Sequence, residues 1–382
     1  MSFRYIKVKT KGQIEGEKLL VPKLRFKEFN NEYKKYKIGD TLKVKSGKDQ
    51  KLIECINGKY PILGTGGQIG TTNNFLYDKP SVLIGRKGTI NKPQYMTTPF
   101  WTVDTLFYTD IKEEFNTKYI FYAFQNINWK KYDESTGVPS LSCKTIEEIL
   151  YYIPNKDEQD KISTFITLLD KKIELQQRRI EALKIYKKGL IQRIYNRTWN
   201  NKIKMEEILI QKSIRNTNDE IHNVYSVSNK DGFILQTDQF KDRIVASEDT
   251  RNYKVVSKND FAYNPARINV GSIARMKQDI KVIISPMYIC FKCNEKILPE
   301  YLEYFFESSK FTYEMNKRLE GSVRICLSYE SMLNIPIELP NKNEQEKISI
   351  FLNCLGNKIK LEEKKFMELN KLKKGLLQKM FI

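Results

Sequence analysis

The sequence predicts an α+β protein: two globular domains of mixed α/β structure separated by two long antiparallel helices, which form a coiled-coil spacer with a pseudo-two-fold arrangement. Three observations carry this prediction. One stretch of sequence occurs twice, both copies have the apolar spacing of a long helix, and the segments before the copies are rich in short β-like runs.

The repeat begins with a shared motif. Residues 153–163 return in nearly the same form at 339–349, and Glu344 follows Glu158 by 186 positions. The same offset relates residues 187–192 to 373–378 at the far end. A duplication that keeps its register for about forty residues is one architectural unit used twice. We therefore expect the protein to bind its partner in two halves.

Both copies are predicted to be long helices. Apolar residues recur in steps of four, three and seven, the heptad pattern of a helix that packs along one stripe. Two positions of this stripe are polar in both copies, Gln176 with Glu362 and Lys187 with Lys373. The alternative, two unrelated amphipathic helices in a globular core, does not explain polar residues at the same offset. The predicted apolar seam of the helical spacer comprises Ile162, Ile166, Leu169, Ile173, Ile180, Leu183, Leu190, Ile194, Ile348, Leu352, Leu355, Ile359, Phe366, Leu369, Leu376 and Met380.

The order of the predicted segments follows from these helices. Pro154 and Pro340 mark where each helix begins, because a proline pushes the preceding residue out of the helical region. β-like runs such as 81–84 and 282–284, separated by Gly, Pro and Asn, predict the strands of the globular segments. The predicted segments are a lead-in (1–30), a first domain (31–153), a central long helix (154–197), a second domain (198–338) and a C-terminal long helix (339–382).

The amino-acid composition indicates which class of partner the chain binds. The chain of 382 residues has 66 Lys and Arg against 46 Asp and Glu, a formal net charge of +20. Such an excess is typical of proteins that bind a polyanion. Six cysteines without regular spacing favour a reduced, cytoplasmic protein over a disulfide framework. The sequence has no apolar signal segment at its start and no run of about 18 apolar residues, so we expect no membrane association.

Several motifs together resemble a known family. They are residues 60–70 and 83–90 in the first domain, residues 263–273 in the second, the lead-in 22–26, and the Ile/Leu-Pro-x-x-x-Glu-Gln-x-Lys-Ile start of both helices. In combination, and over essentially the whole chain, they resemble the specificity (S) subunits of Type I restriction–modification systems. The second domain departs from the pattern, because it lacks the Gly-Gly-x-Ile-Gly stretch of residues 66–70.

The resemblance implies a DNA-recognition role. The two domains would be target-recognition domains, each reading one half of a bipartite, gapped site in double-stranded DNA and directing adenine methylation or restriction by partner subunits. The implied partners are two methyltransferase (M) subunits and, in the full complex, restriction/translocase (R) subunits. S-adenosylmethionine, ATP and magnesium are expected on those partners, and no cofactor is expected on this chain.

Motif by motif, the residues themselves predict no catalytic or metal site. The string 264–267 lacks the second proline and the aromatic residue that the base-holding loop of an adenine methyltransferase needs. Gly47-Lys48 lacks the spacing of a phosphate-binding loop, and Cys290 and Cys293 have no second pair. We therefore expect a non-catalytic subunit. The alternatives are a stand-alone DNA-binding regulator, a coiled-coil scaffold, and a fused methyltransferase.

Candidate DNA contacts are the loop positions rich in Arg, Lys, Asn, Gln and Thr. Cations position a protein on phosphates, while planar amides and Arg read base edges. The alternative for each residue is a solvated surface side chain. Gly85, Gly88 and Gly271 are interpreted as backbone requirements rather than contacts. The candidates are Lys45, Lys48, Gln68, Thr71, Asn73, Asn74, Arg86, Lys87 and Lys92 in the first domain, and Arg215, Asn216, Arg243, Arg251, Asn264, Arg267, Asn269, Arg275 and Arg324 in the second.

Overall fold

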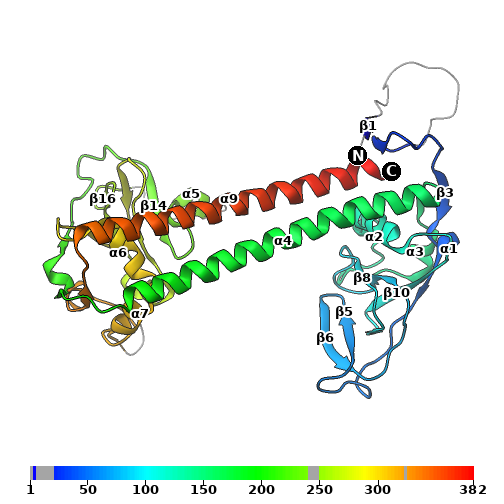
Figure 1. Ribbon diagram of the computed structural model, residues 1–382, viewed down its shortest axis with the longest axis horizontal. Coiled ribbons are helices and arrows are strands. Elements are labelled where there is room, and N and C mark those ends of the chain that lie inside the picture. The colour runs from blue at the N-terminus through cyan, green and yellow to red at the C-terminus, as the bar shows by residue number, and fades with distance from the viewer. Residues whose placement is uncertain (1–2, 6–20, 240–248, 322–324) are drawn as a thin grey trace. The chain divides into compact units, whose positions relative to one another are not determined.

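The computed structural model describes residues 3–5, 21–239, 249–321 and 325–382. It contains two compact units: the first comprises Met1–Gln177 and Lys364–Ile382, and the second comprises Arg178–Glu363. Each unit includes one part of both long helices, α4 (Lys156–Tyr195) and α9 (Lys342–Met380) (Figure 1). Across the described ranges, no helix is both long and apolar enough to cross a membrane.

The first unit is built on a four-stranded antiparallel sheet with the order β4-β10-β7-β8. A smaller sheet, β6-β5-β9, contains a parallel pair, and β11 pairs with β3 just before α4 begins. The strands are β1 (Phe3–Tyr5), β2 (Leu24–Phe26), β3 (Lys34–Lys37), β4 (Leu42–Lys45), β5 (Tyr60–Gly64), β6 (Gly67–Thr72), β7 (Ser81–Gly85), β8 (Gln94–Met96), β9 (Trp101–Thr102), β10 (Leu106–Ile111) and β11 (Leu150–Ile153). The helices are α1 (Ile38–Thr41), α2 (Thr117–Asn126), the 3₁₀ helix η1 (Trp129–Tyr132) and α3 (Cys143–Glu148).

The second unit repeats this plan. Its main sheet has the order β13-β20-β17-β18, and β12 pairs with β21 just before α9 begins. Its second sheet, β15-β14-β19-β16, has four strands where the smaller sheet of the first unit has three. The strands are β12 (Lys202–Lys204), β13 (Leu209–Gln211), β14 (Val224–Ser228), β15 (Gly232–Leu235), β16 (Lys254–Val256), β17 (Phe261–Tyr263), β18 (Ile273–Arg275), β19 (Val282–Ile284), β20 (Ile289–Cys293) and β21 (Pro336–Glu338). The helices are η2 (Met205–Glu207), α5 (Gln236–Gln239), η3 (Pro265–Val270), α6 (Pro299–Phe306), α7 (Ser309–Asn316) and α8 (Tyr329–Leu333).

Each main sheet is covered on both faces, which explains its continuous apolar strands. In β7, Val82 and Ile84 belong to the core that the helices cover, while Leu83 points into the core beneath the smaller sheet. In β17, Phe261 and Tyr263 face the helices and Ala262 faces the second sheet, β15-β14-β19-β16. Because successive strand residues point to opposite faces, a strand buried on both sides reads as an unbroken apolar run.

The shared motif at the start of each long helix has the same structural role in both units. The side chains of Asn155 and Asn341 accept hydrogen bonds from the amides of Glu158 (3.0 Å) and Glu344 (2.9 Å), which caps the helices. Gln159 and Gln345 then anchor each helix to its unit. Their amide oxygens each accept a backbone N–H at the start of α2 or α6, from Asn116 and Leu298, both at 2.9 Å.

The two long helices run antiparallel within each unit. In the first unit Lys373 of α9 pairs with Asp170 of α4 at 2.7 Å, and in the second Glu363 pairs with Lys184 at 2.7 Å. As the residue number falls on one helix it rises on the other. All sixteen predicted seam residues are buried or half-buried. The predicted fold class is confirmed: two mixed α/β domains with long helices between and after them along the chain.

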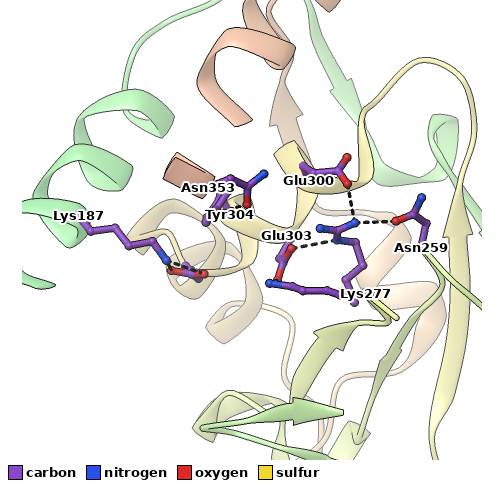
Figure 2. A network of polar contacts seen from close by, with 9 residues as sticks. Lys187, Asn259, Lys277, Glu300, Glu303, Tyr304 and Asn353 are labelled. Carbon is purple, nitrogen blue, oxygen red and sulfur yellow. Dashed lines mark hydrogen bonds and ion pairs between the residues drawn. The ribbon is translucent and has the colours of Figure 1, made fainter. Parts of the chain in front are cut away.

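Of the polar seam positions, Lys187 and Lys373 contact residues outside the seam. In the second unit Lys187 lies over the ring of Tyr304, 4.9 Å from its centroid, and pairs with Glu307 at 3.1 Å (Figure 2). In the first unit Lys373 lies 5.7 Å from the ring centroid of Tyr122. These lysines therefore tie each helical pair to the neighbouring α6 or α2, and the repeated polar position serves packing between helix and domain.

Candidate nucleic-acid interface

The first group of predicted contacts lies on and beside the β5–β6 hairpin. Gln68, Asn73 and Asn74 are exposed. Thr71 and Asn73 also hold the neighbouring loop: the Thr71 hydroxyl donates to the carbonyl of Cys55 at 2.7 Å, and the side-chain oxygen of Asn73 accepts from the amide of Lys59 at 3.2 Å. Three residues of this group are therefore exposed, and Thr71 is half-buried and shapes the loop.

Two lysines near β4 have different surroundings. Lys45 pairs with Asp110 at 2.8 Å, and Tyr77 donates to the same carboxylate at 2.7 Å. Hydrogen bonds from Lys45 and Tyr77 lower the pKa of Asp110. Lys48 has an exposed side chain, while its carbonyl accepts from the indole N–H of Trp101 at 2.9 Å. Lys48 is thus the one of the two that is directed at solvent.

The loop after β7 presents cations. Lys87 and Lys92 are exposed, and Arg86 is half-buried with its guanidinium 6.0 Å from the ring centroid of Phe107. A Cβ on Gly85 would lie 2.2 Å from the carbonyl oxygen of Thr89, and Gly88 has a φ of 85°. Gly271, at the corresponding loop of the second unit, has a φ of 90°. The interpretation of these three glycines as backbone requirements is confirmed.

A neighbouring loop, residues 134–142, was not among the predicted contacts. The amide of Gly88 donates to the carbonyl of Pro139 at 2.8 Å, so this loop lies against the cationic loop after β7. The carboxylate of Glu134 accepts hydrogen bonds from the hydroxyls of Ser142 and Thr145, which hold the pKa of Glu134 below its usual value.

The second unit repeats the anchors of this loop on both sides of residues 322–324, which lie outside the described residues. Glu320 accepts from the hydroxyls of Ser328 and Ser331, which follow Ser142 and Thr145 by 186 positions. The amide of Leu327 donates to the carbonyl of Pro265 at 3.1 Å, so again the loop lies beside the one that follows the central strand. The signal that would have found both loops is the offset of 186, which extends back to Glu134 and Glu320.

Four predicted contacts of the second unit are exposed. Arg215 donates to the side chain of Asn252 at 3.2 Å, and Arg251 pairs with Asp249 at 2.8 Å. Arg267 and Asn269 lie on η3, between β17 and β18. η3 therefore occupies the place that the cationic loop after β7 has in the first unit.

Three others are buried and support the fold. Asn216 accepts from the amide of Ile221, and Asn264 caps η3 by accepting from the amide of Ala266. The guanidinium of Arg275 donates to Glu300 at 2.6 Å and to Glu303 at 2.9 Å, and its side chain is 7% exposed (Figure 2). Arg243 and Arg324 lie outside the described residues.

Comparisons with known proteins agree with this architecture. The chain is 23% identical to the Type I restriction enzyme MjaVIII specificity subunit of Methanocaldococcus jannaschii over 399 aligned positions, which cover 89% of this chain and 90% of the relative. Its fold is similar to the crystal structure of a Type I restriction–modification S subunit from M. genitalium, with a TM-score of 0.63 at 16% identity, covering 95% and 99% of the two chains. A chain from a structural study of complex assembly in a type I R-M system has a TM-score of 0.56 at 10% identity, covering 91% and 97%.

A family model matches most of the chain and identifies its family. The model of the Type I restriction modification DNA specificity domain matches residues 30–184 and again residues 201–371. These two matches correspond to the two copies of the same sheet plan, each followed by a long helix. The chain therefore belongs to the family of Type I restriction modification DNA specificity domains.

Proposed function

We propose that this chain reads a bipartite, gapped site in double-stranded DNA, with each unit contacting one half-site. One observation carries the proposal: the main sheets of the two units have the same strand order and the units have the same helix anchors, but their equivalent loops carry different side chains. A common scaffold that carries different loops suits a target made of two different short sequences. The excess of cations, a formal net charge of +20, supplies attraction to phosphates.

The equivalent loops differ in what they offer to a base pair. After β7 the first unit presents Arg86 and Lys87, whereas after β17 the second unit has a 3₁₀ turn that presents Arg267 and Asn269. Arg pairs with guanine and Asn with adenine through two hydrogen bonds in the major groove. Different side chains at corresponding places are therefore expected to select different half-sites.

We further propose that the long helices bind two methyltransferase subunits, which carry the S-adenosylmethionine chemistry, and that the chain itself supplies recognition. Beyond the seam, the helices have a second apolar stripe that repeats at the same offset: Leu175 with Leu361, and Tyr186 with Leu372. All four side chains are 53–65% exposed. Two identical partners need two equivalent surfaces, and a repeated exposed stripe provides them.

The position of this stripe on the helices supports its use by a partner. We number the heptads so that Ile166 and Leu352 are at position a. Leu175 and Leu361 are then at position c, and Tyr186 and Leu372 are at position g. Positions c and g lie on one side of the seam, and in an antiparallel pair the g sides of both helices share a face. Tyr122 and Tyr304 contact the other side, through Thr167 and Asn353 at position b. The stripe is therefore on the side away from α2 and α6.

The test is genome-wide mapping of N6-methyladenine by long-read sequencing, with the gene intact and then deleted, in a strain that expresses the methyltransferase subunit. We expect the deletion to abolish methylation at one gapped, bipartite motif, and the lost motif gives both half-sites. An unchanged methylome would contradict the proposed function. Restriction of unmodified DNA by the same strain would show that the translocating restriction subunits also take part.

A further inference from the structure

The connection between β4 and β5 in the first unit, residues 46–59, exposes two large aliphatic side chains. Leu52 is 100% exposed and Ile56 is 94% exposed. Single exposed apolar residues are common on protein surfaces. Leu52 and Ile56, however, are four residues apart on one short loop, and the rest of the protein covers almost none of their surface. Both side chains are therefore fully available to a partner.

The loop that carries them is held in one conformation. Its amides at Ile53 and Glu54 both donate to the carbonyl of Gln50, at 3.0 and 2.9 Å, which forms a single helical turn. Its start is tied down by the amide of Lys48, which donates to the carbonyl of Thr102 at 2.9 Å. Its end is tied down by Gly58, whose amide donates to the hydroxyl of Thr71 at 3.0 Å.

Gly47 and Gly58 let the two ends of the loop approach the neighbouring backbone closely. A Cβ on Gly47 would lie 2.0 Å from the carbonyl oxygen of Val103, and one on Gly58 would lie 2.4 Å from the amide nitrogen of Thr72. Asn57, beside Gly58, has a φ of 60°, a conformation that few residues other than glycine adopt. The loop thus displays Leu52 and Ile56 from a preorganised backbone, so little ordering entropy opposes binding there.

The polar residues around the two side chains suit DNA. Lys48, Lys51 and Lys59 are exposed on the same loop. The loop also has two acids: Asp49, which accepts from the amide of Lys51 at 2.8 Å, and the exposed Glu54. An open cleft of about 670 Å³ separates Ile56 and Asn57 from Gln68 and Ile69 of the β5–β6 hairpin. Apolar side chains flanked by lysines match a groove whose rims are phosphates.

The second unit has a different connection at this place. Residues 212–223 join β13 to β14, and their loop is organised around the buried Asn216, whose side chain bonds the amide and carbonyl of Ile221. A partner that binds both units in the same way needs residues that are repeated in both units, and Leu52 and Ile56 are not repeated. The loop is therefore suited to binding the half-site of the first unit, because the half-sites are what differs between the two units.

We propose that Leu52 and Ile56 read thymine, by packing against the 5-methyl groups of thymine bases in the major groove of the half-site bound by the first unit. This inference rests on the proposed function. The thymine methyl is the apolar group that a stacked base pair presents in the major groove. The other apolar surface of DNA is the face of a base, which becomes available only when stacking is broken at considerable cost.

The experiment measures binding of the chain, in complex with its methyltransferase, to duplexes that carry the mapped site. Each thymine of the half-site is replaced in turn by deoxyuridine, which removes one methyl group and nothing else. We expect one or two positions of one half-site to lose affinity by about fourfold, the value of one buried methyl group. The double variant Leu52→Ala/Ile56→Ala should bind the thymine duplex more weakly and no longer distinguish thymine from deoxyuridine at those positions.

The matched control is Ile185→Ala, which removes an aliphatic side chain that is 71% exposed on α4; it should retain the full response to deoxyuridine. The inference is overturned if deoxyuridine has no effect, if the half-site contains no thymine, or if the double variant responds as the native chain does. It is also overturned if the double variant loses the methyltransferase instead, since the loop would then be a protein contact. Failure of the native complex to bind any bipartite duplex would count against the proposed function itself.

Discussion

The side chains of Tyr95 and Arg275 occupy equivalent positions but have opposite chemistry. Tyr95 on β8 pairs in register with Val82, and Arg275 on β18 pairs in register with Phe261, both of which face the helices. Tyr95 packs against Phe121, with ring centroids 5.4 Å apart, and lies beneath the ammonium of Lys118. An aromatic cluster in one unit is thus replaced by an ion-pair network in the other.

This replacement explains why a sequence search misjudges single cations. Arg275 has the residue type of a DNA contact, yet its guanidinium is enclosed by Glu300, Glu303 and Asn259. The acids lie 25 and 28 positions further along the chain, on a separate element. Their approach depends on how α6 packs against β18, and that cannot be derived from local residue types.

We predict that Arg275→Met destabilises the protein by about 3 kcal/mol, because removing one partner of a buried ion pair leaves the carboxylate of Glu300 without its cation. Urea unfolding at neutral pH, monitored by circular dichroism, measures the loss. Adding Glu300→Gln to the variant should recover part of it, since Glu303 keeps its ion pair with Lys277 at 2.6 Å and Glu300 is the acid that loses its cation.

The matched control is Arg267→Ala, an exposed arginine of η3. It should change the free energy of unfolding by less than about 0.5 kcal/mol, while weakening binding to one half-site. The opposite pattern, with Arg275→Met stable but deficient in DNA binding, would identify Arg275 as a contact and contradict its structural assignment.

At the scale of elements, the long helices were the most predictable part of the protein. Their seam and their polar positions follow from local spacing, and Pro154 and Pro340 stand two residues before the helices begin at Lys156 and Lys342. What the spacing could not provide was the reason for the polar positions, because Lys187 and Lys373 contact rings on α6 and α2. The seam also omitted Ile191 and Tyr195, which are buried against the core of the second unit.

The exposed stripe of the helices carries a prediction about assembly. Leu175→Ala and Leu361→Ala should each weaken one methyltransferase contact by about 1.5–3 kcal/mol, the value of burying a leucine side chain. Native mass spectrometry of the complex should then show species with one methyltransferase for either single variant, and still fewer partners for the double variant.

The matched controls for the stripe are Ile185→Ala and Met367→Ala. Both side chains are more exposed than most of the stripe, at 71% and 64%, but neither is repeated at the offset of 186, where Lys371 and Glu181 stand. Their complexes should keep two methyltransferases. Equal losses for stripe and control variants would show that exposure alone, and not the repeated surface, governs assembly.

At the scale of the whole molecule, we predict that helix length sets the unread gap of the DNA site. One heptad inserted between Ile173 and Ile180, with its counterpart between Ile359 and Phe366, keeps the seam in register and adds about 10 Å to each helix. The tolerated gap should grow by about 3 base pairs. Methylome mapping of the variant measures the gap, and an unchanged gap would remove the idea that the helices act as a spacer.

The fold was more predictable from sequence than the site, for a physical reason. Repeats and periodicity persist over tens of residues, so chance residues do not hide them. A DNA contact depends on whether one side chain faces solvent, and Asn216, Asn264 and Arg275 are buried by elements that come from elsewhere in the chain. The loop 134–142 was not predicted because it contains no Arg, Lys, Asn or Gln, whereas its counterpart in the second unit includes the predicted contact Arg324.

The composition of the first unit has a consequence for how the protein is made. That unit includes Lys364–Ile382, and Phe381 packs on Tyr119 with ring centroids 5.1 Å apart. The second unit, Arg178–Glu363, is one continuous segment. During translation the core of the first unit therefore closes only after residues 364–382 have left the ribosome, while the second unit is complete once residue 363 has been made. A product that stops before residue 364 retains a complete second unit and leaves the first one open to chaperones and proteases.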